Sequence, residues 1–204
     1  MKSIYWLGLL GIASLQVLSI NPCFAQSSDN INIPPYLLLE NTPNPPFPSN
    51  QSVLVTEIKV EGNSVLEEDI IKLTKRLLQK KITLQQLLQL RTKITQLYIK
   101  KGYITSGAFI PNNQNFTSGV VQIQVVEGKL EDIVIYGLKR LQKGYVRSRI
   151  QRFTGKPLNQ KRLIQAFQLL QNDPAIERLS AELAQGTRVG YSILEVTIRE
   201  AEEF

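Results

Sequence analysis

Side chains that commonly do chemistry are scarce in this sequence. The 204 residues include no histidine and a single cysteine, Cys23, so imidazole bases and imidazole metal ligands are excluded. Carboxylates cluster at Glu67 to Asp69, at Glu131-Asp132 and at Glu200 to Glu203. None of these clusters lies in the apolar surroundings that would raise a carboxyl pKa for acid and base work. We therefore predict that the protein is not an enzyme and has no catalytic residue, metal ligand or cofactor.

Positive charge is the second feature that could act on a partner. The formal net charge is +7, and no acidic residue interrupts the basic residues between Lys139 and Arg162. Such a field attracts acidic polypeptide segments or membrane headgroups, whereas nucleic acid is not expected because no binding motif is present. A solvated basic face is the alternative. The basic patch consists of Lys139, Arg140, Lys143, Arg147, Arg149 and Arg152, followed by Lys156, Lys161 and Arg162.

The first 25 residues have the order of a secretory signal peptide. Lys2 precedes an apolar run from Ile4 to Ile20, and the small residue Ala25 follows shortly after, so we expect cleavage after Ala25. An uncleaved membrane anchor is the alternative, although the run is slightly short for a span of roughly 20 residues. Residues 26–52 are rich in Pro, Asn and Ser and are predicted to be a linker.

Two capping boxes predict a pair of helices after this linker. In a capping box a Ser or Thr side chain accepts from the backbone three residues on, where a Glu or Gln side chain reaches back. The pairs are Ser64 with Glu67 and Thr83 with Gln86, each followed by apolar residues at helical spacing. Gly102 can adopt a left-handed backbone, so the second helix is expected to end there.

Runs of apolar residues predict three strands around these helices. They include Ile58 to Val60, Tyr103 to Ile110 and Val121 to Val125. Pro111 removes a ladder donor and ends the second of these strands. Two helices can cover one face of such a sheet, which gives a complete domain over residues 53–128.

The same order of elements recurs in residues 129–204. Gly62 and Gly137 mark equivalent turns about 75 residues apart. We therefore predict an α+β fold of two tandem β-α-α-β-β domains, each a three-stranded mixed sheet covered by two helices. In the second domain we expect strands at Ile133 to Ile135, Ile176 to Leu183 and Tyr191 to Arg199, and helices around Val146 and after Asn159.

Four stretches of the sequence resemble a known family. They read GYITSGAFIP followed by Gln, then GVVQIQVVEGKLEDIVIYG, DPAIERLSAEL and GYSILEVTIREA. Over roughly residues 53 to 200 they are similar to the paired polypeptide-transport-associated (POTRA) domains of two-partner secretion transporters, the family of haemolysin activation and secretion proteins. The motif residues are Gly102, Tyr103, Pro111 and Gln114, with one residue more between the last two than in the usual Pro-x-Gln.

This resemblance implies a periplasmic pair of domains, exported by the signal peptide and tethered to the outer membrane. Such domains capture an unfolded secreted exoprotein, here called the client, and pass it to an outer-membrane β-barrel. Because the sequence stops at about the place where that barrel would begin, we expect a fragment of a longer gene product. The expected partners are the client, the barrel and the membrane surface.

A client that arrives unfolded can add as a strand to an exposed sheet edge. We expect this edge in the strand before Pro111, because proline is typical of edge strands and Gly107 permits close approach of another backbone. The alternative is that Ile104, Ala108 and Ile110 simply belong to the core. The expected client-binding residues are Tyr103, Ile104, Thr105, Ser106, Gly107, Ala108, Phe109 and Ile110.

Two other classes of function remain open. If residues 1–25 stay uncleaved, the same domains would suit a membrane-anchored scaffold that organises protein partners without transport. An enzyme that uses Glu131 or Asp132 is the third interpretation, and the absence of histidine disfavours it.

Overall fold

The computed structural model describes residues 52–112 and 114–202. The predicted signal peptide at 1–25, and all but the last residue of the predicted linker at 26–52, lie outside the described residues. No helix within the described ranges has the length and apolar character needed to cross a membrane.

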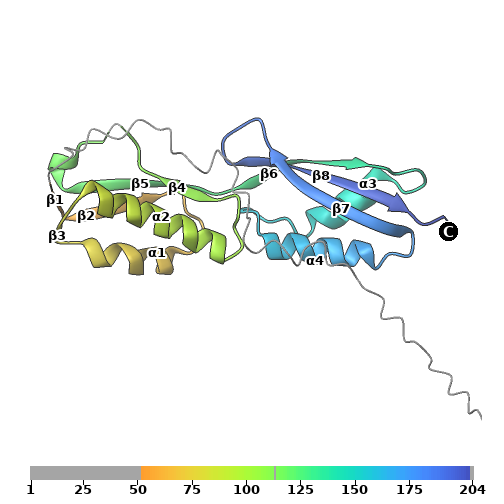
Figure 1. Cartoon of the computed structure of the whole chain (residues 1–204), viewed down its shortest axis with the longest axis horizontal. Coiled ribbons are helices and arrows are strands. Elements are labelled where there is room, and N and C mark those ends of the chain that lie inside the picture. Colours follow the sequence, from red (N-terminus) through yellow and green to blue (C-terminus); the bar gives the residue numbers. More distant parts are fainter. Residues whose placement is uncertain (1–51, 113, 203–204) are drawn as a thin grey trace, which may run out of the picture. The chain divides into compact units, whose positions relative to one another are not determined.

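The first domain is a three-stranded mixed sheet with two helices on one face (Figure 1). The strand order is β2-β5-β4, with β5 parallel to β2 and antiparallel to β4, so β2 and β4 are the edges. A further two-stranded antiparallel sheet joins β1 and β3. The elements are β1 (Val53–Val55), β2 (Glu57–Glu61), α1 (Glu67–Thr74), η2 (Lys75–Leu77), β3 (Lys80–Ile82), α2 (Leu84–Lys100), β4 (Gly107–Phe109), η3 (Phe116–Ser118) and β5 (Val120–Val126).

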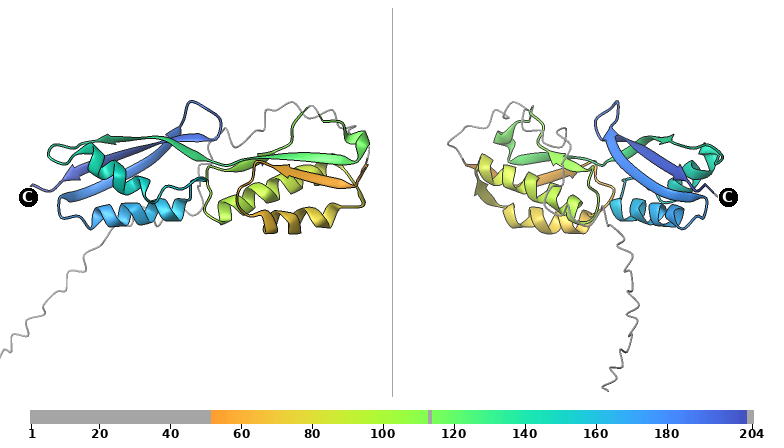
Figure 2. Two further views of the ribbon diagram at one scale, coloured as in Figure 1. Left: turned by 180° about the vertical axis from the view of Figure 1, so that it is seen from behind. Right: turned by 45° about the vertical axis from the view of Figure 1, so that its right-hand side comes forward.

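The second domain repeats this arrangement. Its strand order is β6-β8-β7, with β8 parallel to β6 and antiparallel to β7, and the two helices lie against one face of the sheet (Figure 2). The elements are β6 (Lys129–Tyr136), α3 (Lys143–Gln151), α4 (Gln160–Gln171), β7 (Ile176–Gln185) and β8 (Tyr191–Glu200). The predicted α+β fold, with two mixed sheets of three strands, is confirmed.

Each sheet buries its own apolar core under its helices. Buried residues alternate with more exposed ones along β5, as predicted, and the same holds for β8. The first core includes Leu87, Leu90, Ile94, Tyr98, Val121, Ile123 and Val125. The second includes Ile133, Ile135, Val146, Ile150, Leu163, Leu170, Leu194, Val196 and Ile198.

Both ends of α2 follow from local sequence. At its start the Thr83 hydroxyl accepts from the Gln86 N–H, and the Gln86 side chain accepts from the Thr83 N–H, which confirms the predicted capping box. At its end Gly102 has a φ of +91°. The Gly102 N–H donates to the Ile99 carbonyl and the Tyr103 N–H to the Tyr98 carbonyl, the hydrogen-bond pattern of a Schellman motif.

The capping box predicted at Ser64 and Glu67 is wrong. The residue that precedes α1 is Leu66, whose φ is +63° and which makes no side-chain cap. The Ser64 hydroxyl donates instead to the carboxylate of Glu127, with an O···O distance of 2.5 Å. A carboxylate from the distant end of β5 has therefore taken the place of the local partner.

The strand predicted from Tyr103 to Ile110 is mostly wrong in its extent. Only β4, Gly107–Phe109, pairs with β5, because the Ser106 N–H donates to the Tyr103 carbonyl in a turn. The sheet of β1 and β3 was not predicted, since strands of three residues leave no alternation long enough to detect.

Candidate functional site

The predicted client-binding edge, Tyr103 to Ile110, is largely buried. Five of its residues are less than 9% exposed, and Tyr103, Ile104 and Phe109 are half-buried. β4 does lie at the edge of its sheet. The buried positions are Thr105, Ser106, Gly107, Ala108 and Ile110.

The outer side of β4 is occupied by a side chain from α2. The hydroxyl of Thr95 accepts a 3.0 Å hydrogen bond from the Ala108 N–H and donates to the Arg91 carbonyl. Because N–H groups alternate in direction along a strand, Ala108 is the residue of β4 whose N–H faces away from β5. An added strand would have to displace Thr95 before it could pair here.

The motif residues Pro111 and Gln114 complete the pairing of β5 beyond β4. The last pair of the two strands is Phe109 with Gln124. Two residues further on, the same register would set Pro111 opposite Gln122, but proline has no N–H to donate. The Gln114 side-chain amide supplies both missing partners: it accepts from the Gln122 N–H at 2.8 Å and donates to the Gln122 carbonyl at 3.1 Å. It also donates to the Pro111 carbonyl at 3.1 Å, which fixes the turn.

The glycine of the VVEG stretch allows the turn after α2 to approach closely. A Cβ at Gly128 would collide with the side chain and carbonyl oxygen of Thr105. The Gly128 N–H donates to the Ser106 hydroxyl at 2.9 Å, and its carbonyl accepts from the Leu158 N–H at 2.7 Å. The predicted edge residues Thr105 and Ser106 are therefore packing residues in this structure.

A glutamate at the end of the last strand of each domain holds the turn before the first helix. In the first domain Glu127 accepts from the N–H groups of Ser64 and Val65, at 2.6 and 3.2 Å, and from the Tyr98 hydroxyl at 3.0 Å. Burial, together with the negative charge of Glu127, raises the pKa of Tyr98. The VVEG stretch therefore serves the fold through its glutamate as well as its glycine.

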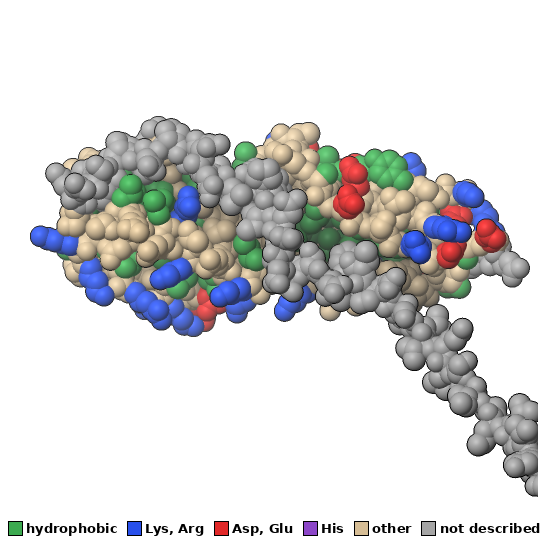
Figure 3. Space-filling model, viewed as in Figure 1, with side chains coloured by type: hydrophobic (Ala, Val, Ile, Leu, Met, Phe, Trp, Pro, Cys, Tyr) green, Lys and Arg blue, Asp and Glu red, His purple; other side chains and the backbone are tan. Residues whose placement is uncertain are grey.

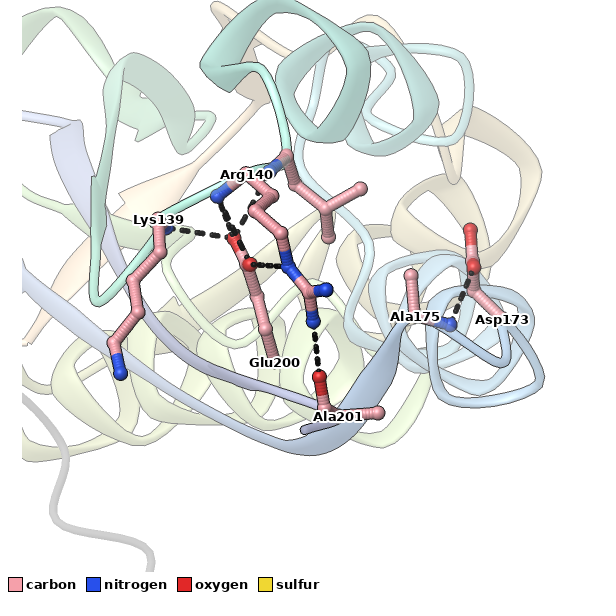
Figure 4. Close-up of polar contacts among 7 residues, drawn as sticks. Lys139, Arg140, Asp173, Ala175, Glu200 and Ala201 are labelled. Atoms are coloured by element: carbon pink, nitrogen blue, oxygen red, sulfur yellow. Dashed lines mark hydrogen bonds and ion pairs between the residues drawn. The ribbon is translucent and has the colours of Figure 1, made fainter. Parts of the chain in front are cut away.

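Glu200 has the same role in the second domain, as Figure 4 shows. Its carboxylate accepts from the backbone N–H groups of Leu141, Lys139 and Arg140, at 2.7 to 3.0 Å. These bonds, the one from Leu141 first, lower the pKa of Glu200. The Arg140 guanidinium lies 3.6 Å from the same carboxylate and donates to the Ala201 carbonyl.

The predicted basic patch is partly neutralised by contacts within the second domain. Besides Arg140, the Arg147 guanidinium pairs with Asp132 at 2.6 Å, which lowers the pKa of Asp132, and Arg149 lies 4.4 Å from the centre of the Tyr145 ring. Lys139, Lys143 and Arg152 are exposed and form no ion pair with a described residue.

A hollow of about 270 Å³ lies between the edge of β6 and the end of α3, and Arg147 lines it. The same arginine donates to the Ile133 carbonyl at 2.5 Å, so it covers part of the outer side of β6. The described residues hold no cluster of acidic, cysteine or histidine side chains suited to a metal ion. The remaining lining residues are Leu130, Glu131, Asp132, Ile133, Gln151, Thr154, Gly155 and Lys156.

β7 has the longest edge with no neighbour. It spans Ile176–Gln185, pairs on one side with β8, and receives no hydrogen bond from any other described element on its outer side. Leu179, Ala181 and Leu183 alternate toward the core, and the last two stay partly exposed. The alternation of this strand could be predicted from the sequence. The strand order, which makes β7 an edge, could not.

Comparisons with known proteins identify the domains. The family model described as "POTRA domain, ShlB-type" matches residues 53–128. The outer membrane transporter CdiB of Dickeya dadantii is 31% identical over 146 residues, which are 71% of this chain and 25% of the relative. CdiB of Escherichia coli O6:K15:H31 is 33% identical over 104 residues, or 51% of this chain and 17% of the relative. The chain thus spans at most about a quarter of the length of these relatives.

Solved structures agree with these matches. CdiB from Escherichia coli has a TM-score of 0.60 at 26% identity, over 81% of this chain and 30% of the other. The N-terminal domain of Omp85 from Thermosynechococcus elongatus has a TM-score of 0.63 at 21% identity, over 78% of this chain and 68% of the other. This likeness shows the shared fold. The relatives are named as transporters rather than enzymes, in agreement with the non-enzymatic prediction. Residues 53–128 are a ShlB-type POTRA domain, and the chain is homologous to the CdiB outer membrane transporters of two-partner secretion.

Proposed function

We propose that this chain is the periplasmic POTRA module of an outer-membrane two-partner secretion transporter, exported by a signal peptide and tethered to the outer membrane. It captures an unfolded exoprotein by strand addition and passes it to a β-barrel. The observation that carries the proposal is the open edge of β7, ten residues long. An extended client can pair with such an edge through its backbone without a fixed sequence.

A comparison of the four edges of the two three-stranded sheets favours β7 over the β4 edge expected from the sequence. β4 pairs over three residues and Thr95 occupies its outward N–H. β6 is partly covered by Arg147, and β2 is half as long as β7. The partly exposed apolar residues Ala181 and Leu183 offer contacts for apolar client side chains.

The register of β7 identifies where an added strand would bond. The Gly186 N–H donates to the Tyr191 carbonyl across the hairpin, so even-numbered residues from Arg178 onward face β8 and odd-numbered ones present their N–H outward. Ala181 is one of the outward-facing residues. Proline at position 181 removes one outward-facing N–H and leaves the hydrogen bonds with β8 in place. Edge strands tolerate proline at such positions.

The test measures binding of the chain to the secretion domain of a candidate exoprotein client. Ala181→Pro should weaken binding at least about tenfold, the effect of losing roughly 1.4 kcal/mol, while Ala181→Ser, which keeps the N–H, should bind like the parent chain. Circular dichroism checks that both variants are folded. Unchanged binding by Ala181→Pro would rule out β7, and no binding by the parent chain at low salt would overturn client capture.

A further inference from the structure

The helical side of the first domain carries a second concentration of positive charge. From Ile70 to Val126 the sequence contains no Asp or Glu, and with +9 in this segment and +7 overall, the rest of the chain carries −2. This surface is here called the basic helical face. Its cations are Lys72, Lys75, Arg76, Lys80, Lys81, Arg91, Lys93, Lys100 and Lys101.

The fold places these side chains on the solvent side of the helical layer. α1 and α2 bury their apolar residues toward the sheet, so the cations lie on their outer surfaces and on the adjoining η2 and β3, while the acidic residues of this layer, Glu67 to Asp69, are confined to the first turn of α1. Figure 3 shows lysine and arginine side chains gathered over α1 and α2. Every cation of the face is exposed except Arg91, which is half-buried.

Very little of this charge is neutralised within the described part of the chain. Asp69 is shared between Lys72 and Lys101, with N···O distances of 3.8 and 3.5 Å. The Lys80 ammonium donates to the Arg76 carbonyl, which leaves its charge uncompensated. No described carboxylate pairs with Lys75, Lys81, Lys93 or Lys100.

The composition of the face favours phosphate headgroups over carboxylates. Seven of its cations are lysines, which bind phosphate as flexible point charges, whereas paired recognition of carboxylates is typical of arginine. Ile71 lies next to Lys72 on α1 and is 40% exposed, so the face also offers an apolar side chain to an interface. Charges spread over two helices suit an extended anionic surface better than a single small ligand.

We propose that the basic helical face binds an anionic phospholipid bilayer. The homologous CdiB proteins are outer membrane transporters, so a POTRA domain of this kind works beside a membrane. Such contact would hold the first domain against the bilayer through α1 and α2. Client capture at β7 does not use this face, so either proposal can fail without the other.

The test compares two variants of the chain that lose the same number of exposed lysines. One is K75Q/K81Q/K93Q/K100Q in the basic helical face, and the matched control is K139Q/K143Q/K156Q/K161Q in the second domain. Binding is measured by sedimentation with vesicles of phosphatidylglycerol and phosphatidylcholine, and with vesicles of phosphatidylcholine alone. The neutral vesicles account for any contribution of the apolar N-terminal residues, which all variants share.

We expect binding to the anionic vesicles that weakens with salt. The first variant should lose about fivefold in affinity for each charge removed, on the order of a hundredfold or more in all, and the control should change far less. Equal loss in both variants, or no preference for anionic vesicles in the parent chain, would overturn the proposal. So would binding to soluble polyglutamate through the same lysines without vesicle binding, which would identify an acidic polypeptide as the partner.

Discussion

Single carboxylates and amides connect parts of this chain that are distant in sequence. Glu127 reaches Ser64 across 63 positions, and Glu200 reaches Lys139 across 61. In each case the last strand of a domain supplies the acceptor for N–H groups that a turn leaves unpaired. The first helix of each domain is thus positioned by a residue that is added to the chain only after the rest of that domain.

The titration of Glu200 gives a prediction about acid stability. Its hydrogen bonds hold the pKa of Glu200 below the ordinary value of 4.5. The ionised carboxylate therefore contributes to folding stability above that pH, and this stability is lost as the pH falls through the folded-state pKa. Glu200→Gln, which does not titrate, should lower stability at neutral pH and make the decline in acid less steep. Urea unfolding across this pH range measures both effects. Glu202→Gln, an exposed neighbour, is the control, and an equal change in its profile would contradict the assignment.

At the scale of elements, the sequence predicted what is decided locally. The box at Thr83 and the stop at Gly102 were confirmed, because their hydrogen bonds join residues within five positions of each other. The capping box predicted at Ser64 was wrong because the actual partner of Ser64, Glu127, lies far along the chain. The same applies to the candidate site: alternation reveals a strand such as β7, but only the strand order reveals which edges are open.

The contact between α2 and β4 gives a prediction at this scale. Thr95→Val keeps the shape of the side chain but leaves the Ala108 N–H without an acceptor in a site that is 8% exposed, which should destabilise the first domain by about 1 to 3 kcal/mol. Thr95→Ser retains the hydroxyl and should stay close to the parent chain. Urea midpoints compare the two, and faster amide exchange at Ala108 in Thr95→Val would locate the effect. Equal stability of the two variants would show that the hydroxyl is not needed.

At the scale of the whole molecule, the described residues form two apolar cores with no residue in common. Each is built from the same order of elements and closed by its own glutamate. Each domain also has a long segment without Asp or Glu, from Ile70 to Val126 in the first and from Ile133 to Asn172 in the second. The two domains are thus alike in fold and in their supply of basic residues, and they differ in which carboxylates pair with those residues.

Separate cores predict separate unfolding. Leu90→Ala, in a site 2% exposed, should destabilise the first domain, and Ile150→Ala, in a fully buried site, the second, each by about 2 to 5 kcal/mol. Calorimetry should show two transitions, of which each variant lowers one. A single transition lowered equally by both variants would mean that the domains unfold as one cooperative unit.

The amide of Gln114 also explains why the connection after Pro111 can differ in length. The sheet requires only that one amide group stand opposite Gln122, bonded to its N–H and carbonyl, and a flexible side chain can deliver that group from loops of more than one size. For protein engineering, an insertion between Pro111 and Gln114 has to keep this amide within reach of Gln122 if the end of the sheet is to stay intact.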